Sequence, residues 1–125
     1  MPNLESAQCS GARDAAKRFY SFHFGNDMQY SRENLDLRKS YLTPAFYESL
    51  KSWRSGIRDP FTRATDDFPR TFKIGRCSEL SDSQVDMQIQ IYWKDDHATV
   101  QQELAAFLDK SGDTWLLSGV EPPGH

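Results

Sequence analysis

The chain has little cysteine and no long apolar run. Its 125 residues include two cysteines, Cys9 and Cys77. Zinc sites need Cys or His in close pairs, and this spacing matches none of those motifs, so we expect no metal and no cofactor. No apolar stretch approaches the roughly 20 residues that a membrane-spanning helix requires. We therefore expect no membrane span.

Basic charge is also scarce. The chain carries 15 Lys and Arg against 18 Asp and Glu, a formal net charge of −3. Nucleic-acid-binding domains usually carry a basic excess that neutralises phosphates, so we expect no nucleic-acid partner. Aromatic residues make up 13% of the chain, which argues against disorder, and the length suffices for one domain with its own core.

The two cysteines leave two interpretations open. Cys9 and Cys77 are either unrelated thiols or one disulfide that ties the N-terminal segment to the second half of the chain. A disulfide would imply an oxidising compartment. The first residues, Met1–Ser6, show no charged segment followed by an apolar one. Either the protein is cytosolic, therefore, or a leader has been removed.

The chain changes its hydrophobic period near the middle. Residues 12–24 and 44–54 place apolar side chains every three or four positions, as amphipathic helices do. From residue 84 the apolar side chains recur at every second position, as in a strand with one buried face. Helices followed by strands predict an α+β domain. We expect N-terminal helices packed on the concave face of a curved four-stranded antiparallel sheet.

The first helix bounds the domain at its N-terminal end. Ser10 is the candidate N-cap, and the helix would start directly after it. Residues 1–10 are then a flexible arm, residues 11–121 a single α+β domain, and residues 122–125 a tail.

Two further helices are expected before the sheet. Ser31 or Asn34 would open a short one. Thr43 followed by Pro44 is the strongest local signal, because a threonine cap and a proline at the first helical position favour a new helix.

Four strands are expected in the second half, at residues 71–77, 84–93, 98–108 and 114–120. The turns between them are short and rich in Ser, Asp and Lys. Because short turns can join only antiparallel neighbours, we expect an antiparallel meander.

The segment between the helices and the strands, residues 57–70, is long and irregular. Its carboxylates could act as an acid and a base or bind a cation. Alternatively, they could accept backbone hydrogen bonds and shape the loop, an interpretation that the nearby arginines favour. The candidate residues are Asp59, Arg63, Asp66 and Asp67.

Several short sequences resemble a known superfamily. They are Phe19-Tyr20, Tyr41-Leu42-Thr43-Pro44, Asp59-Pro60-Phe61 with Ala64 and Asp66, and Gly112-Asp113-Thr114-Trp115. Their order resembles the nuclear-transport-factor-two-like superfamily, whose cone-shaped fold is shared with ketosteroid isomerase. Within it, the chain is similar to an uncharacterised bacterial family of small, often exported proteins. The resemblance spans residues 12–121, and it implies a periplasmic or exported location and dimers through the outer sheet face.

The inside of such a cone is a possible ligand pocket. Isomerase-like chemistry needs a carboxylate and a proton donor that converge in an apolar interior. The inward-facing residues of the predicted strands are apolar except Gln102, which cannot titrate, so we assign no catalytic residue. His23 is a candidate for the pocket or for a hydrogen-bonded core position. The pocket candidates are Tyr20, His23, Trp53, Trp93 and Gln102.

The outer face of the sheet is polar but carries few charges. Aromatic side chains among neutral polar groups are typical of protein–protein interfaces, although an ordinary solvated face is the alternative. The interface candidates are Gln88, Gln90, Tyr92, Gln101 and Glu103. We expect a non-enzymatic binding or protein-interaction domain of the bacterial envelope, with a protein partner or a second copy on this face. A small apolar-ligand carrier is the alternative, followed by an isomerase- or hydrolase-like enzyme.

Overall fold

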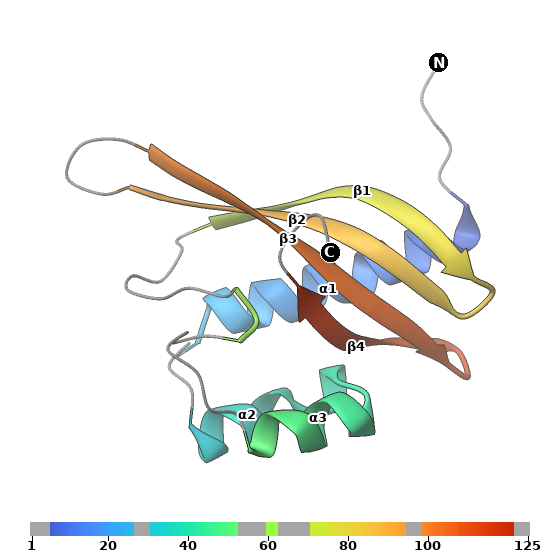
Figure 1. Cartoon of the computed structure of the whole chain (residues 1–125), viewed down its shortest axis with the longest axis horizontal. Coiled ribbons are helices and arrows are strands. Elements are labelled where there is room, and N and C mark those ends of the chain that lie inside the picture. The colour runs from blue at the N-terminus through green and yellow to red at the C-terminus, as the bar shows by residue number, and fades with distance from the viewer. Residues whose placement is uncertain (1–5, 27–30, 53–59, 63–70, 95–98, 122–125) are drawn as a thin grey trace.

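The computed structural model describes residues 6–26, 31–52, 60–62, 71–94 and 99–121, and excludes the side chains of Trp93, Lys94 and Val100. Helices occupy the first part and strands the second (Figure 1). The bounds are Ala7–Phe24 for α1, Arg32–Arg38 for α2, Lys39–Tyr41 for the 3-10 helix η1, Pro44–Lys51 for α3, Thr71–Ser81 for β1, Gln84–Lys94 for β2, Thr99–Ser111 for β3 and Thr114–Glu121 for β4.

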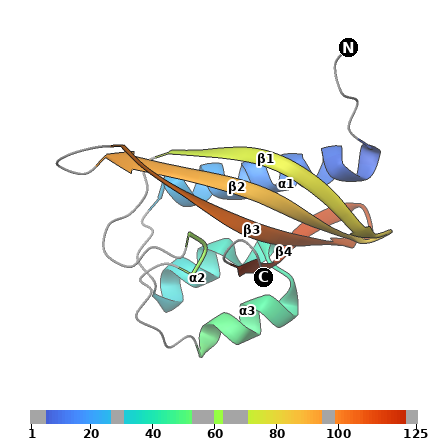
Figure 2. The ribbon, with the colours of Figure 1, turned by 45° about the horizontal axis from the view of Figure 1, so that its top comes forward.

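The four strands form one antiparallel sheet in the order β1-β2-β3-β4. Figure 2 shows the three helices on one side of this curved sheet, whereas none of the described elements lies on the other side. Helix α1 contacts all four strands. The predicted α+β class, with helices on the concave face of a meander, is confirmed. None of the described helices is long and apolar enough to cross a membrane.

The helix starts follow their caps. Ser31 accepts a hydrogen bond from the backbone N–H of Asn34 at 3.1 Å, so Ser31 is the cap of α2. Thr43 caps α3 with Pro44 in the first turn, as predicted. For α1 the prediction is wrong. The cap is Ser6, which accepts from the N–H of Cys9 at 3.1 Å, and residues 7–10 form the first turn of the helix.

The core lies between α1 and the inner face of the sheet. The alternation in β2 is confirmed, because the inner side chains of this strand are fully buried and their β3 partners face the same way. Burying one such side chain stabilises the fold by about 1.5–3 kcal/mol. The buried residues of the two central strands are Val85, Met87, Ile89, Ile91, Leu104, Ala106 and Leu108 on this face.

Helices α2 and α3 are joined by the hydroxyl of Tyr47, which donates a hydrogen bond to the Asp36 carboxylate. This hydrogen bond is the main reason why the pKa of Asp36 is lowered, and the positive charge of Arg32 adds to it. The same hydrogen bond raises the pKa of Tyr47. At neutral pH the hydrogen bond therefore favours the ionised carboxylate of Asp36 and the protonated hydroxyl of Tyr47.

We expect Tyr47→Phe to lower the melting temperature at pH 6 and to leave it nearly unchanged at pH 2. Because the folded-state pKa of Asp36 lies below its unfolded value, the stabilisation is complete above the unfolded pKa of about 3.9 and is lost as the pH falls through the folded value. Thermal denaturation across this pH range measures the difference. Tyr41→Phe is the control, and a pH-independent difference for Tyr47→Phe would contradict the assignment.

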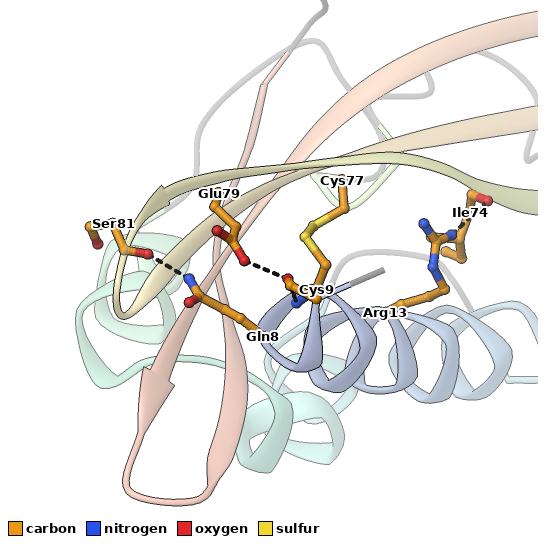
Figure 3. The surroundings of a disulfide bond; sticks show 8 residues. Gln8, Cys9, Arg13, Ile74, Cys77, Glu79 and Ser81 are labelled. Atoms are coloured by element: carbon orange, nitrogen blue, oxygen red, sulfur yellow. Dashed lines mark hydrogen bonds between the residues drawn. A yellow bond between two sulfur atoms is a disulfide. The ribbon is translucent and has the colours of Figure 1, made fainter. Parts of the chain in front are cut away.

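The N-terminal end of α1 is fastened to β1 (Figure 3). Cys9 and Cys77 form a disulfide with their Cα atoms 6.0 Å apart, so the disulfide is the correct one of the two interpretations. Gln8 donates a hydrogen bond to the carbonyl of Ser81, and Arg13 donates to the carbonyl of Ile74 at 3.1 Å. These contacts explain the early start of α1, since they tie its first turns to the sheet.

Replacing both cysteines by serine should lower the melting temperature by about 10 °C. The bond joins residues 68 positions apart, and a disulfide typically stabilises a protein by about 2–4 kcal/mol. For a domain of this size, such a loss lowers the melting temperature by roughly 10 °C. Differential scanning calorimetry should give the same melting temperature for the double variant and for the wild type under reductant. Ser10→Ala, on the same turn, is the control. A wild-type transition that reductant does not move would show that the disulfide is absent.

Candidate functional site

The C-terminal half of α1 carries an aromatic cluster. Tyr20 is 0% exposed, and its hydroxyl donates a 2.8 Å hydrogen bond to the carbonyl of Phe61. His23 is 1% exposed and packs against the rings of Phe19 and Phe61, at centroid distances of 5.6 and 5.0 Å. These two predicted pocket residues are therefore buried among the described residues, and their role in a pocket stays a prediction.

A buried arginine completes this cluster. Arg38 of α2 is 1% exposed. Its Nε donates a 2.7 Å hydrogen bond to Nδ1 of His23, and Nη1 donates to the carbonyl of Asn34 at 2.7 Å. Because the guanidinium stays protonated, Nδ1 of His23 accepts this bond as an unprotonated nitrogen. The pair anchors α2 to α1.

Sequence analysis did not single out Arg38. The signal available was its spacing, because Leu35, Arg38 and Leu42 recur at three- and four-residue intervals and all three are buried. A charged residue on an apolar stripe is normally placed outside the core. Here the hydrogen bonds of the guanidinium compensate part of its desolvation.

Arg38→Ala should reduce the free energy of unfolding by about 3 kcal/mol, since it removes the buried hydrogen bonds of the guanidinium to His23 and to the carbonyl of Asn34. Urea denaturation measures this loss. Arg32→Ala is the matched control on the same helix, because the Arg32 side chain is 59% exposed and solvent screens such surface pairs, so a smaller loss is expected. Equal effects of the two substitutions would show that the Arg38 bonds do not hold α2.

The remaining pocket and loop candidates are only partly described. Gln102 is half-buried opposite Ile91, on the inner face as predicted. Trp53, the side chain of Trp93 and the loop candidates lie outside the described residues, and their roles stay predictions. The loop candidates are Asp59, Arg63, Asp66 and Asp67. Across the described ranges, no group of three or more His, Cys, Asp or Glu is placed to hold a metal ion.

The outer face brings the predicted interface residues together. Gln90 lies opposite Glu103, and Tyr92 lies opposite Gln101, on adjacent strands. The hydroxyl of Tyr92 donates a 3.0 Å hydrogen bond to Oε1 of Gln90. All of these side chains except Gln101 are half-buried even though none of the described elements covers them. The polar groups of this face are thus held in place by their neighbours.

Gln88 has a structural role on the same face. Its Oε1 accepts a 3.1 Å hydrogen bond from the backbone N–H of Arg76, within a bulge of β1 between Ile74 and Cys77. A Cβ atom on Gly75 would lie 2.3 Å from this oxygen. Glycine at position 75 therefore leaves room for the amide that fastens the bulge.

Comparison with known proteins supports the fold. Neither a protein-family model nor a curated protein matches the chain. Solved structures do. An NTF2-like protein involved in plasmid conjugation aligns with 96% of this chain at a TM-score of 0.56 and 12% identity. The chain spans 41% of the length of that protein.

A second solved structure is similar over nearly its whole length. It is a protein of unknown function from Bacteroides thetaiotaomicron, with a TM-score of 0.56 and 16% identity over 92% of this chain and 91% of that protein. Likeness at these identities shows the fold alone. The fold is NTF2-like.

Proposed function

We propose that this chain is a non-enzymatic protein-interaction domain that binds a second copy of itself through the outer face of the sheet. The observation that carries the proposal is the ordered polar surface of β2 and β3, which none of the described elements covers. The helices occupy the other face, so the outer face is the broad surface left among the described elements. Its aromatic and amide side chains are of the kind enriched at protein interfaces.

The hydrogen bonds within this face favour binding. A side chain that is already held in one rotamer loses less conformational entropy when a partner covers it. Tyr92 holds Gln90, and the amide of Gln84 donates a 3.0 Å hydrogen bond to Asp109. The free donors and acceptors of such amides can pair with their own copies across a two-fold axis.

The centre of the face suits a copy of itself. Gln88 lies opposite Ala105 there, and Ala105 is 6% exposed. Lys73 and Glu103 both lie opposite Gln90, one on each adjacent strand. The row of Gln90 therefore combines a neutral amide with one charge of each sign.

The area of the outer face is also close to that of a standard protein–protein interface. β2 has 11 residues, which at about 3.3 Å per residue gives a length of about 36 Å, and four strands at about 4.8 Å give a width of about 19 Å. The projected area is roughly 700 Å², close to the roughly 800 Å² per partner of a standard interface.

We further propose a bacterial, exported or periplasmic setting. The Cys9–Cys77 disulfide supports it, because such bonds persist in oxidising compartments and are rare in the cytosol of most organisms. The similar structure from a Bacteroides species agrees with a bacterial origin. The calorimetry of the double cysteine variant and of the reduced wild type bears on this proposal as well as on the fold.

The combined substitution Gln90→Lys and Gln101→Lys should convert a dimer into a monomer. The lysines would lie on neighbouring strands and face their copies across the two-fold axis, where like charges repel. Sedimentation velocity at several protein concentrations measures the change.

The control carries the same added charge on another surface. Ser10→Lys with Ser21→Lys places two lysines on the exposed side of α1, and this variant should remain a dimer. A wild-type chain that stays monomeric at high concentration would overturn the proposal. A loss of the dimer in both variants would show that net charge, and not this face, controls association.

A further inference from the structure

A groove lies on the helical side of the sheet, between α1, η1 and the beginning of β4. Its volume is about 210 Å³. The inner part is apolar, because its side chains belong to the buried core. The buried lining residues are Ala15, Ala16, Phe19, Leu108, Trp115 and Leu117. The two alanines of α1 create the space, since larger side chains at these positions would fill it.

The rim of this groove is polar. Arg18, Ser40 and Thr114 are exposed, and Tyr41 is half-buried against the ring of Phe19. Among the described residues, no hydrogen bond or ion pair joins the Arg18 guanidinium or these hydroxyls to another side chain. The lining contains no Asp or Glu. One cation and three hydroxyls therefore surround an apolar recess.

We propose that the groove binds a small amphipathic carboxylate. A guanidinium is a planar fork that matches the two oxygens of a carboxylate, and the hydroxyls can donate further hydrogen bonds. The apolar part of the ligand would cover Leu117 and Trp115. A doubly charged phosphate would need more positive charge than Arg18 alone supplies.

The volume limits the size of the ligand. Pockets for drug-sized molecules measure about 300–1,000 Å³, and this groove is smaller at about 210 Å³. It therefore suits one aromatic ring or a short alkyl chain attached to the carboxylate. The site lies across the sheet from the outer face, so it is independent of self-association.

The test compares 3-phenylpropionate with its neutral amide, 3-phenylpropionamide, by NMR titration of the labelled protein. We expect the acid to shift the resonances of Leu108, Trp115 and Leu117 and to bind more tightly than the amide. Arg18→Gln should weaken binding of the acid about three- to fivefold, as for an exposed ion pair, and leave binding of the amide unchanged. Lys17→Gln removes the same charge from the next residue, outside the groove, and should change neither.

Several outcomes would overturn the proposal. They are the absence of shifts at the groove, equal affinities of the wild type for acid and amide, and equal losses in the two charge variants. Tighter binding of a peptide with an apolar C-terminal residue than of the small acid would assign the groove to a protein terminus instead. The variant with lysines at residues 90 and 101 should keep acid binding, so failure of this site and failure of the proposed dimer are distinguishable.

Discussion

The structure depends on one helix that covers a whole sheet. Helix α1 contacts all four strands, and the inner side chains of β2 reach complete burial beneath it. A single helix over a curved sheet must be held at both ends, because tilting it would expose that core. The disulfide of Cys9 holds one end. At the other, Tyr20 bonds to the 60–62 segment and His23 accepts from Arg38.

The contacts that hold α1 also determine how side chains pack between this helix and the sheet. The aromatic side chains that anchor the C-terminal half of α1 pack against one another, and the buried Tyr20 and His23 belong to this packing. The groove lies nearer the N-terminal end of α1, beside the small side chains of Ala15 and Ala16. Phe19 belongs to both, since it lines the groove and packs against His23 and Phe61.

The sequence predicts what depends on local periodicity. The two-residue alternation of β2 identified both faces of the sheet, and the register with β3 follows that alternation residue by residue. The sequence predicts Thr43 as a cap and offers Ser31 as one of two candidates, because a cap acts within a few residues of itself. Interface candidates such as Gln90 and Glu103 lie together because β2 and β3 are consecutive strands joined by a short connection.

What the sequence could not predict depends on contacts between distant segments. Ser6 and Ser10 both suit a helix cap, and the choice follows from attachment of the first turn to β1. The spacing of the two cysteines does not show whether they pair. The burial of Arg38 requires His23 from another helix. The groove likewise needs α1, η1 and β4 at once. Sites built from a single face are visible in the sequence, whereas sites built between layers become visible only when the layers are packed.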